Sequence, residues 1–345
     1  MVCSTLISLV VCFGVSLALN SWELPQAFVN SELDQNWMWF KKAYNKSFTN
    51  ENEEITRRLY WEDNMKFIRQ HNEKYYRGEV TYSVGENDFA DMADDEFEKT
   101  YLRGLIVPEG EENDYPEGLT EPDVQLPREL DWRVQGLVSS VKNQGKCGSC
   151  WAFSALGALE GQVIKNHGGS EIPDLSEQNL VDCAKGEKYH NLGCKGGWMH
   201  NAYQYIKDNG GIDSEFCYPY RAIDQTCRYI RECRTARDCG YKKVGRNEYS
   251  LRKALSNVGP IAIAMDVNHK GFWFYKEGIF YEPACNGTRP THAMVAVGYG
   301  KRGGRYWIIK NSWGEGWGNK GYVYAARGRG DLCGIAKWGV YPTGV

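Results

Sequence analysis

Two stretches of the chain carry a helical spacing of side chains. In residues 50–76, six positions follow one another at steps of four, four, three, four and four: Glu53, Arg57, Trp61, Asn64, Ile68 and Asn72. This spacing predicts one long helix with all six on one face. In residues 151–164, apolar side chains recur at steps near three and four: Phe153, Leu156, Leu159, Val163 and Ile164. They predict a second helix that is buried on one face.

The stripe of the first helix is half polar. A plain amphipathic helix would bury an apolar stripe, whereas buried polar groups need hydrogen-bond partners. The segment Gly85-Glu86-Asn87-Asp88-Phe89-Ala90-Asp91 follows closely. We therefore expect the helix and this segment to belong to an organised polar network.

Residues 108–125 change in composition. They are acidic and rich in proline and glycine, beginning Pro108-Glu109-Gly110-Glu111-Glu112. That composition is typical of an exposed linker. We interpret it as a cleavable junction between the cysteine-free first part of the chain and the rest.

The N-terminus predicts export. Residues 5–19 are apolar and uncharged and contain Ser16-Leu17-Ala18, a small-x-small cleavage signal. The stretch is short for a segment that spans a bilayer, so we interpret residues 1–18 as a secretory signal peptide. Asn45 and Asn286 begin glycosylation acceptor motifs, which fit the same route.

Cysteines are distributed unevenly. Of the 12, Cys3 and Cys12 lie in the expected signal peptide, none lies between residues 20 and 146, and the others fall between Cys147 and Cys333. The first part can therefore be removed without breaking a covalent bond. The second part suits an oxidising compartment.

Composition narrows the functional classes. The 345 residues are 42% hydrophobic and 25% charged, which is ordinary for a globular protein. A formal net charge of -3 argues against nucleic acid or an anionic membrane surface as the main partner. No second Cys-x-x-Cys and no His-x₃₋₅-His accompanies Cys147–Cys150, so we expect no metal site and no cofactor.

Three motifs offer the parts of a thiol nucleophile. Cys150 opens the second predicted helix, where the positive end of the helix dipole would lower the thiol pKa from its usual value of about 8.5. His292, in Thr291-His292-Ala293, would supply an imidazolium beside the thiolate. Asn311 could orient the imidazole, and Gln144 with the backbone N–H of Cys150 could bind an oxyanion. A thiol, an imidazole and an amide in this order along the chain predict nucleophilic catalysis.

Two other interpretations stay open at this point. Cys147 and Cys150 could form a redox dithiol, although no thioredoxin-like βαβ pattern surrounds them. The chain could also be a non-catalytic binding protein, because a fold does not guarantee an activity.

The motifs together resemble those of the papain family of cysteine proteases, in the precursor form of the cathepsin L type, over essentially the whole chain. The run around Cys150 is similar to the family's nucleophile motif, and Asn311-Ser312-Trp313-Gly314 to its asparagine motif. The first helical stripe and the segment that begins at Gly85 resemble two prosegment motifs of the cathepsin L branch.

The resemblance implies an α+β, papain-like fold with a helical lobe and a β-barrel-like lobe, preceded by a helical inhibitory prosegment. It implies a signal peptide over 1–18, a propeptide over 19–125 and a protease domain over 126–345. Cys150 would be the nucleophile, His292 the base and acid, Asn311 its orienter and Gln144 the oxyanion donor. The prosegment would run along the cleft in the non-productive direction and leave at acidic pH.

The resemblance also implies three disulfides: Cys147–Cys194, Cys183–Cys227 and Cys285–Cys333. Cys217, Cys233 and Cys239 are left over, in or near a basic stretch that looks like an insertion. Because three is odd, at most one further bridge can form and at least one thiol stays free or pairs with another chain.

Substrate would lie against several positions implied by the resemblance. Gly196 and Gly197 would pair with substrate backbone, Thr291 would line the site, and Trp313 would shield the Asn311–His292 contact. The main pocket would hold the side chain two before the scissile bond, and its expected lining is Trp198, Met199, Ala264, Pro290 and Trp338. If its two tryptophans point inward, they narrow an apolar pocket that prefers Leu, Val or Pro over Phe.

We therefore expect a cysteine endopeptidase made as a zymogen, in the lysosome or outside the cell. Its expected partners are protein and peptide substrates, its own propeptide, and proteinaceous inhibitors of cysteine proteases. The resemblance implies a monomer.

Overall fold

The computed structural model describes residues 29–119, 125–168 and 173–345, so the expected signal peptide lies outside the described residues. The described chain divides into two compact units, with the boundary between Glu62 and Asp63. The helices of the described chain are η2 (Ser31–Leu33), α1 (Asp34–Ala43), α2 (Glu51–Tyr76), α3 (Asp94–Phe97), η3 (Glu98–Leu102), η4 (Glu111–Asn113), α4 (Cys150–His167), α5 (Glu177–Cys183), η5 (Gly193–Lys195), α6 (Met199–Asn209), η6 (Arg231–Cys233), α7 (Glu248–Asn257), α8 (Lys270–Trp273) and η7 (Leu332–Gly334). Helix α2 has the bounds that the stripe predicted, to within one residue.

The first unit packs α1 against the beginning of α2. Trp37 lies 5.6 Å from Trp61 between ring centroids, and both rings are buried. The guanidinium of Arg58 lies over both rings and is 2.7 Å from Glu62 and 3.1 Å from Asp34. A buried arginine is thus paired on both sides, as its charge requires.

In the second unit, the polar positions of α2 hold the segment that follows it. Asn64 is buried and donates to the carbonyl oxygens of Ala90 (2.9 Å) and Met92 (3.0 Å). Asn72 exchanges two hydrogen bonds with the backbone of Val84. The organised network expected from the half-polar stripe is confirmed, because each buried amide replaces water with backbone partners.

Nine strands form the main sheet of the second unit, in the order β1-β7-β10-β9-β8-β6-β11-β5, with β2 paired to β8. Two more, β3 and β4, form a small ribbon. The strands are β1 (Tyr82–Val84), β2 (Leu130–Asp131), β3 (Ile212–Asp213), β4 (Arg234–Ala236), β5 (Tyr241–Lys243), β6 (Ile261–Met265), β7 (Tyr275–Phe280), β8 (His292–Gly300), β9 (Tyr306–Lys310), β10 (Tyr322–Ala326) and β11 (Val340–Pro342). Only β10 and β7 pair in parallel among the described strands; the other pairs are antiparallel.

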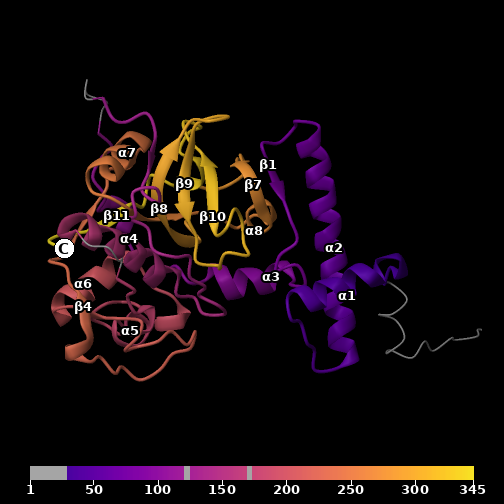
Figure 1. Cartoon of the computed structure of the whole chain (residues 1–345), viewed down its shortest axis with the longest axis horizontal. Helices are drawn as coiled ribbons and strands as arrows, with labels where there is room; N and C mark the ends of the chain where they lie inside the picture. The colour runs from indigo at the N-terminus through magenta and orange to yellow at the C-terminus, as the bar shows by residue number, and fades with distance from the viewer. Residues whose placement is uncertain (1–28, 120–124, 169–172) are drawn as a thin grey trace, which may run out of the picture. The chain divides into compact units, whose positions relative to one another are not determined.

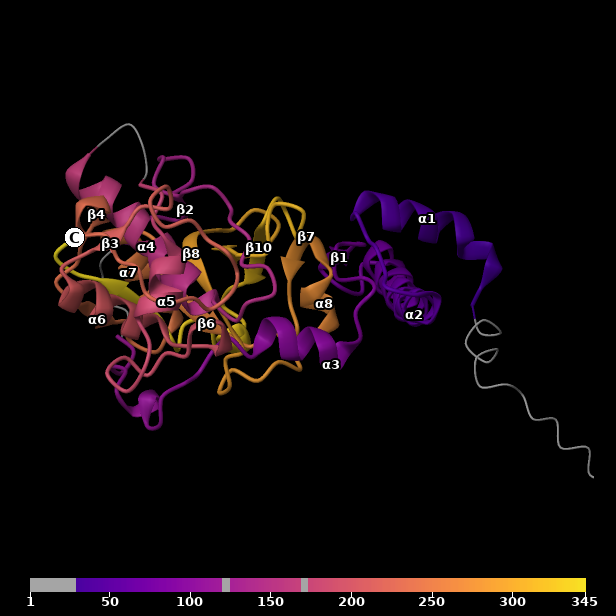
Figure 2. The same cartoon turned by 90° about the horizontal axis from the view of Figure 1, so that it is seen from below.

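Helices and sheet occupy different sides of the second unit. Helices α4, α5 and α6 gather in one lobe, and β8, β9 and β10 form the other (Figures 1 and 2). Ser176 caps α5 and Asn247 caps α7, each by accepting a backbone N–H from the first turn. The expected α+β class with a helical lobe and a sheet lobe is confirmed.

Helix α4 differs from its prediction in one respect. Every residue from Cys150 to Gln162 is buried, so the helix is enclosed all round and not on one face only. It packs against β8 and β6 as well as α5 and α6. Its glycines permit this close packing, since a Cβ on Gly157 would lie 2.9 Å from Val295.

The acidic segment also differs from its prediction. Glu111 and Tyr115 are each only 3% exposed, although their neighbours Glu112 and Glu117 are exposed. The expectation of an exposed linker is therefore wrong for part of residues 108–119, because these two side chains find partners in the second unit. Residues 120–124 lie outside the described chain.

Four disulfides cross-link the described part of the second unit. Cys147–Cys194, Cys183–Cys227 and Cys285–Cys333 are the pairs that the resemblance implied. The fourth joins Cys217 to Cys233. Among the described residues, Cys150 and Cys239 remain free thiols. No helix in the described part of the chain is long and apolar enough to cross a membrane.

Candidate active site

Cys150 is the first residue of α4 and is completely buried. The first N–H groups of a helix have no carbonyl acceptor within the helix. Those of Cys150 and Trp151 interact with the Cys150 sulfur, as does the backbone N–H of Ala293, the residue after His292. The thiol therefore lies at the junction of α4 and the start of β8. Because Cys147 is bonded to Cys194, Cys150 has no partner for the redox chemistry considered from the sequence.

His292 begins β8, and Asn311 follows the end of β9, its antiparallel neighbour. The Nε2 atom of His292 lies 2.8 Å from Oδ1 of Asn311. The backbone N–H of Ser312 donates to the same Oδ1 at 2.8 Å, which identifies that atom as the acceptor. Nε2 must then carry a proton, so a neutral His292 keeps its lone pair on Nδ1. Nδ1 is buried and has no hydrogen-bond partner among the described residues.

Trp313 and Gln144 enclose the pair. The indole of Trp313 lies 4.7 Å from the His292 ring between centroids. Gln144 is fully buried, accepts a hydrogen bond from the hydroxyl of Ser312 at 2.7 Å and donates to the carbonyl of Cys147 at 2.9 Å. An amide NH₂ has two donors, so one N–H of Gln144 is not used by this contact.

Residues 89–106 cover the site. The rings of Phe89, Phe97 and Tyr101 pack on Trp313 at centroid distances of 5.5, 5.5 and 6.1 Å. Further along, Leu105 forms a parallel bridge with Gly197. The backbone N–H of Ile106 donates to Gly197 at 3.0 Å, and that of Gly197 donates to Gly104 at 3.2 Å. A chain that enters the cleft in the opposite direction would pair antiparallel with Gly197.

Burial holds the Cys150 thiol and the His292 imidazole neutral in this state. It raises the pKa of Cys150 to about 12, against the lowering effect of the backbone N–H groups. It lowers the pKa of His292 to about 4, against the hydrogen bond to Asn311. At neutral pH the two groups are thus thiol and imidazole rather than thiolate and imidazolium.

The expected pocket residues come together in part. Trp198, Met199, Ala264 and Trp338 belong to one buried cluster, and the two tryptophans meet edge to face at 5.7 Å. Pro290 is buried two residues before His292, and Thr291 donates its backbone N–H to Met265. Gly196 and Gly197 lie against Ile106 and Gly104, as described above for the covering segment.

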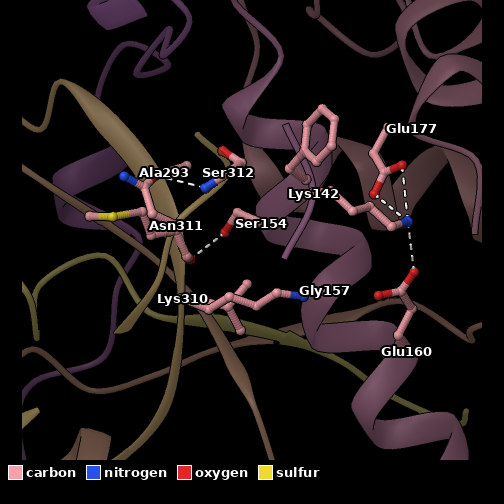
Figure 3. Close-up of a pocket in the computed structure, with 12 residues that line it drawn as sticks. Lys142, Ser154, Gly157, Glu160, Glu177, Ala293, Lys310, Asn311 and Ser312 are labelled. Atoms are coloured by element: carbon pink, nitrogen blue, oxygen red, sulfur yellow. Dashed lines mark hydrogen bonds and ion pairs between the residues drawn. The ribbon is translucent and has the colours of Figure 1, made fainter. Parts of the chain in front are cut away.

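A charged cluster behind the site was missed by sequence reasoning. The ammonium group of Lys142 lies 3.1 Å from Glu160 and 2.9 Å from Glu177, two carboxylates that are almost fully buried. Figure 3 shows Lys142 between them, with Lys310 reaching toward α4 at Gly157. Burial raises the pKa of Glu177 to about 8 and lowers that of Lys310 to about 8. The partners are too far apart in sequence for any local pattern to reveal them.

Glu111 is a second residue that the sequence did not reveal. Its carboxylate accepts a hydrogen bond from the indole N–H of Trp198 at 3.1 Å and lies 2.8 Å from Lys243. The Nδ1 atom of His200 is 3.2 Å away. Only the burial of a glutamate within an acidic run distinguishes it from its neighbours, and burial requires the folded chain.

The site combines a thiol at a helix N-terminus with an imidazole oriented by an amide, and a segment of the same chain covers both. This arrangement is typical of a thiol hydrolase in an inactive precursor form. The comparisons agree with this class. Residues 126–343 match the papain family cysteine protease domain, and residues 37–97 match the cathepsin propeptide inhibitor domain. The chain belongs to the papain family and is a cathepsin L-like cysteine endopeptidase in its proenzyme form.

The similarity extends over almost the whole chain. It is 42% identical to cathepsin L2 of Homo sapiens over 340 residues, covering 96% of this chain and 97% of that protein. It is equally identical to a cathepsin L-like peptidase of Aedes aegypti over 352 residues, covering 98% of each. Among solved structures, digestive procathepsin L 3 of Tenebrio molitor larval midgut is 40% identical, with a TM-score of 0.82 over 91% of this chain and 100% of that one.

Proposed function

We propose that Cys150 is the nucleophile of the endopeptidase, His292 its base and acid, and Asn311 the residue that orients His292. The observation that carries this assignment is the hydrogen bond between Nε2 of His292 and Asn311. This hydrogen bond leaves the lone pair of neutral His292 on Nδ1. The next residue, Ala293, contacts the Cys150 sulfur through its backbone N–H.

The reaction would follow from these positions once the cleft is open. The Cys150 thiol gives its proton to Nδ1 of His292, and the thiolate attacks the substrate carbonyl carbon. The unused N–H of Gln144 and the N–H of Cys150 bind the resulting oxyanion. His292 returns the proton to the leaving amine as the C–N bond breaks, which leaves a thioester. A water molecule then gives a proton to His292, attacks the thioester and releases the carboxylic acid and the thiol.

We further propose the segment boundaries 1–18 for the signal peptide, 19–125 for the propeptide and 126–345 for the mature protease. Cleavage would fall near residues 124–128. The mature enzyme would act as a monomer in the lysosome or outside the cell, on protein and peptide substrates, and would be open to proteinaceous inhibitors. The edge-to-face pair of Trp198 and Trp338 supports a narrowed apolar pocket that favours Leu, Val or Pro over Phe.

Acid maturation of the purified precursor beside its Cys150→Ala variant tests the assignment. We expect the native precursor to shorten to a chain beginning near residues 124–128 and to gain hydrolysis that an epoxide thiol trap abolishes. Cys150→Ala should gain none, even after its propeptide is removed by added native enzyme. Trap-sensitive hydrolysis in Cys150→Ala would show that another residue is the nucleophile. The rates of hydrolysis of Leu, Pro and Phe dipeptidyl substrates then test the preference of the main pocket. A strong preference for Phe would contradict a narrowed pocket.

Glu111 makes propeptide release dependent on pH. Burial acts to raise the pKa of Glu111, but His200 and Lys243 outweigh it, and the net pKa lies below its ordinary value. A lowered carboxyl pKa stabilises the docked state above the free value of about 4.3, and this stabilisation is lost as the pH falls through the lowered value. Acid therefore loosens the propeptide at this contact.

Replacing Glu111 with Gln should speed maturation at pH 7. The loss of a buried ion pair weakens docking by about 3 kcal/mol, roughly a hundredfold in the docking equilibrium. The difference from the native precursor should shrink as the pH falls through the lowered pKa of Glu111, where Glu111 itself becomes protonated. The rate of mature-chain appearance against pH measures this, with the exposed neighbour Glu112→Gln as control. Equal rates for Glu111→Gln and native protein at pH 7 would contradict it.

A further inference from the structure

The pocket that holds Glu111 is built from donors of the protease domain. The carboxylate of Glu111 contacts the indole N–H of Trp198, the ammonium group of Lys243 and Nδ1 of His200. A second indole N–H, that of Trp338, is buried there against Tyr115 and has no hydrogen-bond partner among the described residues. None of these groups of the protease domain is an acid.

Lys243 depends on the propeptide for its negative partners. The ion pairs of Lys243 in the described chain are to Glu111 at 2.8 Å and to Asp114 at 3.7 Å, and both carboxylates lie in the proposed propeptide. The ring of Tyr115 lies under the same ammonium group at 4.9 Å. When the propeptide leaves, Lys243 loses both carboxylates and the aromatic face together. Among the described residues from 125 onward, no carboxylate pairs with Lys243, so the pocket of the mature enzyme would be positive.

Regular elements hold the pocket in place. Trp198 follows Gly197, the residue that pairs with the covering segment, and His200 lies in the first turn of α6. Lys243 ends β5, which pairs with β11. The His200 ring stacks on Tyr241 of the same strand at 4.8 Å. Donors on a helix and a strand are held ready for a ligand, so little ordering is needed on binding.

The surroundings of the pocket are also positive. The lining of an adjoining cavity includes Arg246, Arg289, Lys337 and Trp338 from the proposed protease domain and Glu112 and Glu117 from the proposed propeptide. The guanidinium of Arg246 donates to the carbonyl of Glu112. A cleft wall with one sign of charge attracts peptides of the opposite sign.

We propose that, in the mature enzyme, the Trp198–His200–Lys243 pocket binds an acidic side chain of the substrate on the N-terminal side of the scissile bond. Glu111 occupies in the precursor the place that a substrate Glu or Asp takes after maturation. This inference rests on the proposed function, because it assigns a substrate class to the same cleft. The acidic preference would arise from the indole N–H groups and the charge of Lys243. The apolar preference of the main pocket would arise from the faces of its tryptophan rings.

The test compares tetrapeptidyl substrates on acid-matured native enzyme. Each carries Glu, Gln or Leu at one of the positions two, three or four before the scissile bond. A charge-assisted contact predicts a kcat/KM for Glu that exceeds that for the isosteric Gln by roughly ten- to a hundredfold at one position. Glu and Gln substrates cleaved equally at all three positions would overturn the proposal without any variant.

Variants of residues in β5 then identify the side chain that causes the preference for Glu over Gln. Lys243→Met should remove the preference for Glu over Gln, and Lys243→Glu should replace it with a preference for Lys. The matched control is Lys242→Met, since Lys242 is the exposed neighbour on the same strand. A Glu preference that survives in Lys243→Met would also overturn the proposal.

Titration of active enzyme with the epoxide trap and hydrolysis of the Leu series keep the two proposals apart. If both are intact in native enzyme and Glu is not preferred, the pocket assignment is wrong and the catalytic assignment stands. If neither series is hydrolysed and no thiol is titrated, the catalytic assignment is wrong and the pocket proposal falls with it.

Discussion

Replacing His292 with alanine is expected to lower kcat/KM by about 10⁵-fold or more, the scale seen when a catalytic base is removed from a nucleophile pair. The imidazole has three tasks in the proposed mechanism: it takes the thiol proton, stabilises the thiolate as imidazolium, and returns the proton to the leaving amine. The backbone N–H of Ala293, the residue after His292, interacts with the Cys150 sulfur. The variant, freed of its propeptide by added native enzyme, would be assayed on a peptide substrate.

The matched control is His167→Ala, because His167 is exposed at the end of α4. It should retain full activity. Activity of His292→Ala within tenfold of native would contradict the assignment of the base.

Alkylation of Cys150 against pH separates loss of the base from a general disturbance of the site. In mature native enzyme the imidazolium should keep the thiol reactive at acidic pH, whereas in mature His292→Ala its reactivity should rise near the free value of about 8.5. The intact precursor should alkylate slowly at pH 7, since burial raises the pKa of Cys150 to about 12 and the thiol stays protonated.

Replacing Lys142 with methionine is expected to lower the free energy of unfolding by about 5 kcal/mol at pH 8, the upper end for breaking a buried ion pair. The upper end applies because two buried acidic side chains lose the same ammonium group together. Glu160 is 1% exposed and Glu177 2% exposed at the side chain, and both pair with Lys142 (Figure 3). The ammonium group also lies 2.8 Å from Asp174, which is exposed and can turn to water.

The loss should grow as the pH rises above about 8. Burial already raises the pKa of Glu177 to about 8, against the lowering effect of Lys142, and removing Lys142 raises it further. A raised carboxyl pKa means that the folded state binds more protons, so its contribution to stability falls as the pH rises from the unfolded value of about 4.3. Below about pH 8 Glu177 keeps its proton with or without Lys142, so its charge adds to the loss mainly above that pH.

Urea unfolding of the Lys142→Met precursor would measure this loss. A Cys150→Ala background prevents self-digestion. Lys146→Met is the control, because Lys146 is exposed four residues away and should change stability little. A loss under about 1 kcal/mol at pH 8 would mean that water or another cation relieves the two carboxylates, contrary to the assigned network.

The sequence by itself determined the features whose signals are local. The long α2 helix, the helix that begins at Cys150 and the α+β class follow from side-chain spacing and family motifs, and the structure has them. The polar stripe of α2 predicted a network because a buried amide must be satisfied, and Asn64 and Asn72 meet backbone partners. Cysteine arithmetic allowed at most one bridge beyond the three implied, and that bridge is Cys217–Cys233.

Only the tertiary structure decided which side chains are enclosed. Hydrophobic spacing placed α4 with one buried face, but layers on several sides bury it all round. An acidic run predicts an exposed linker because unpaired charges favour water. Glu111 is nevertheless buried, because Trp198 and Lys243 compensate its charge. Those partners lie far along the chain, as do the carboxylates that pair with Lys142. Burial of a charge depends on partners brought together from distant positions, and no local pattern records that meeting.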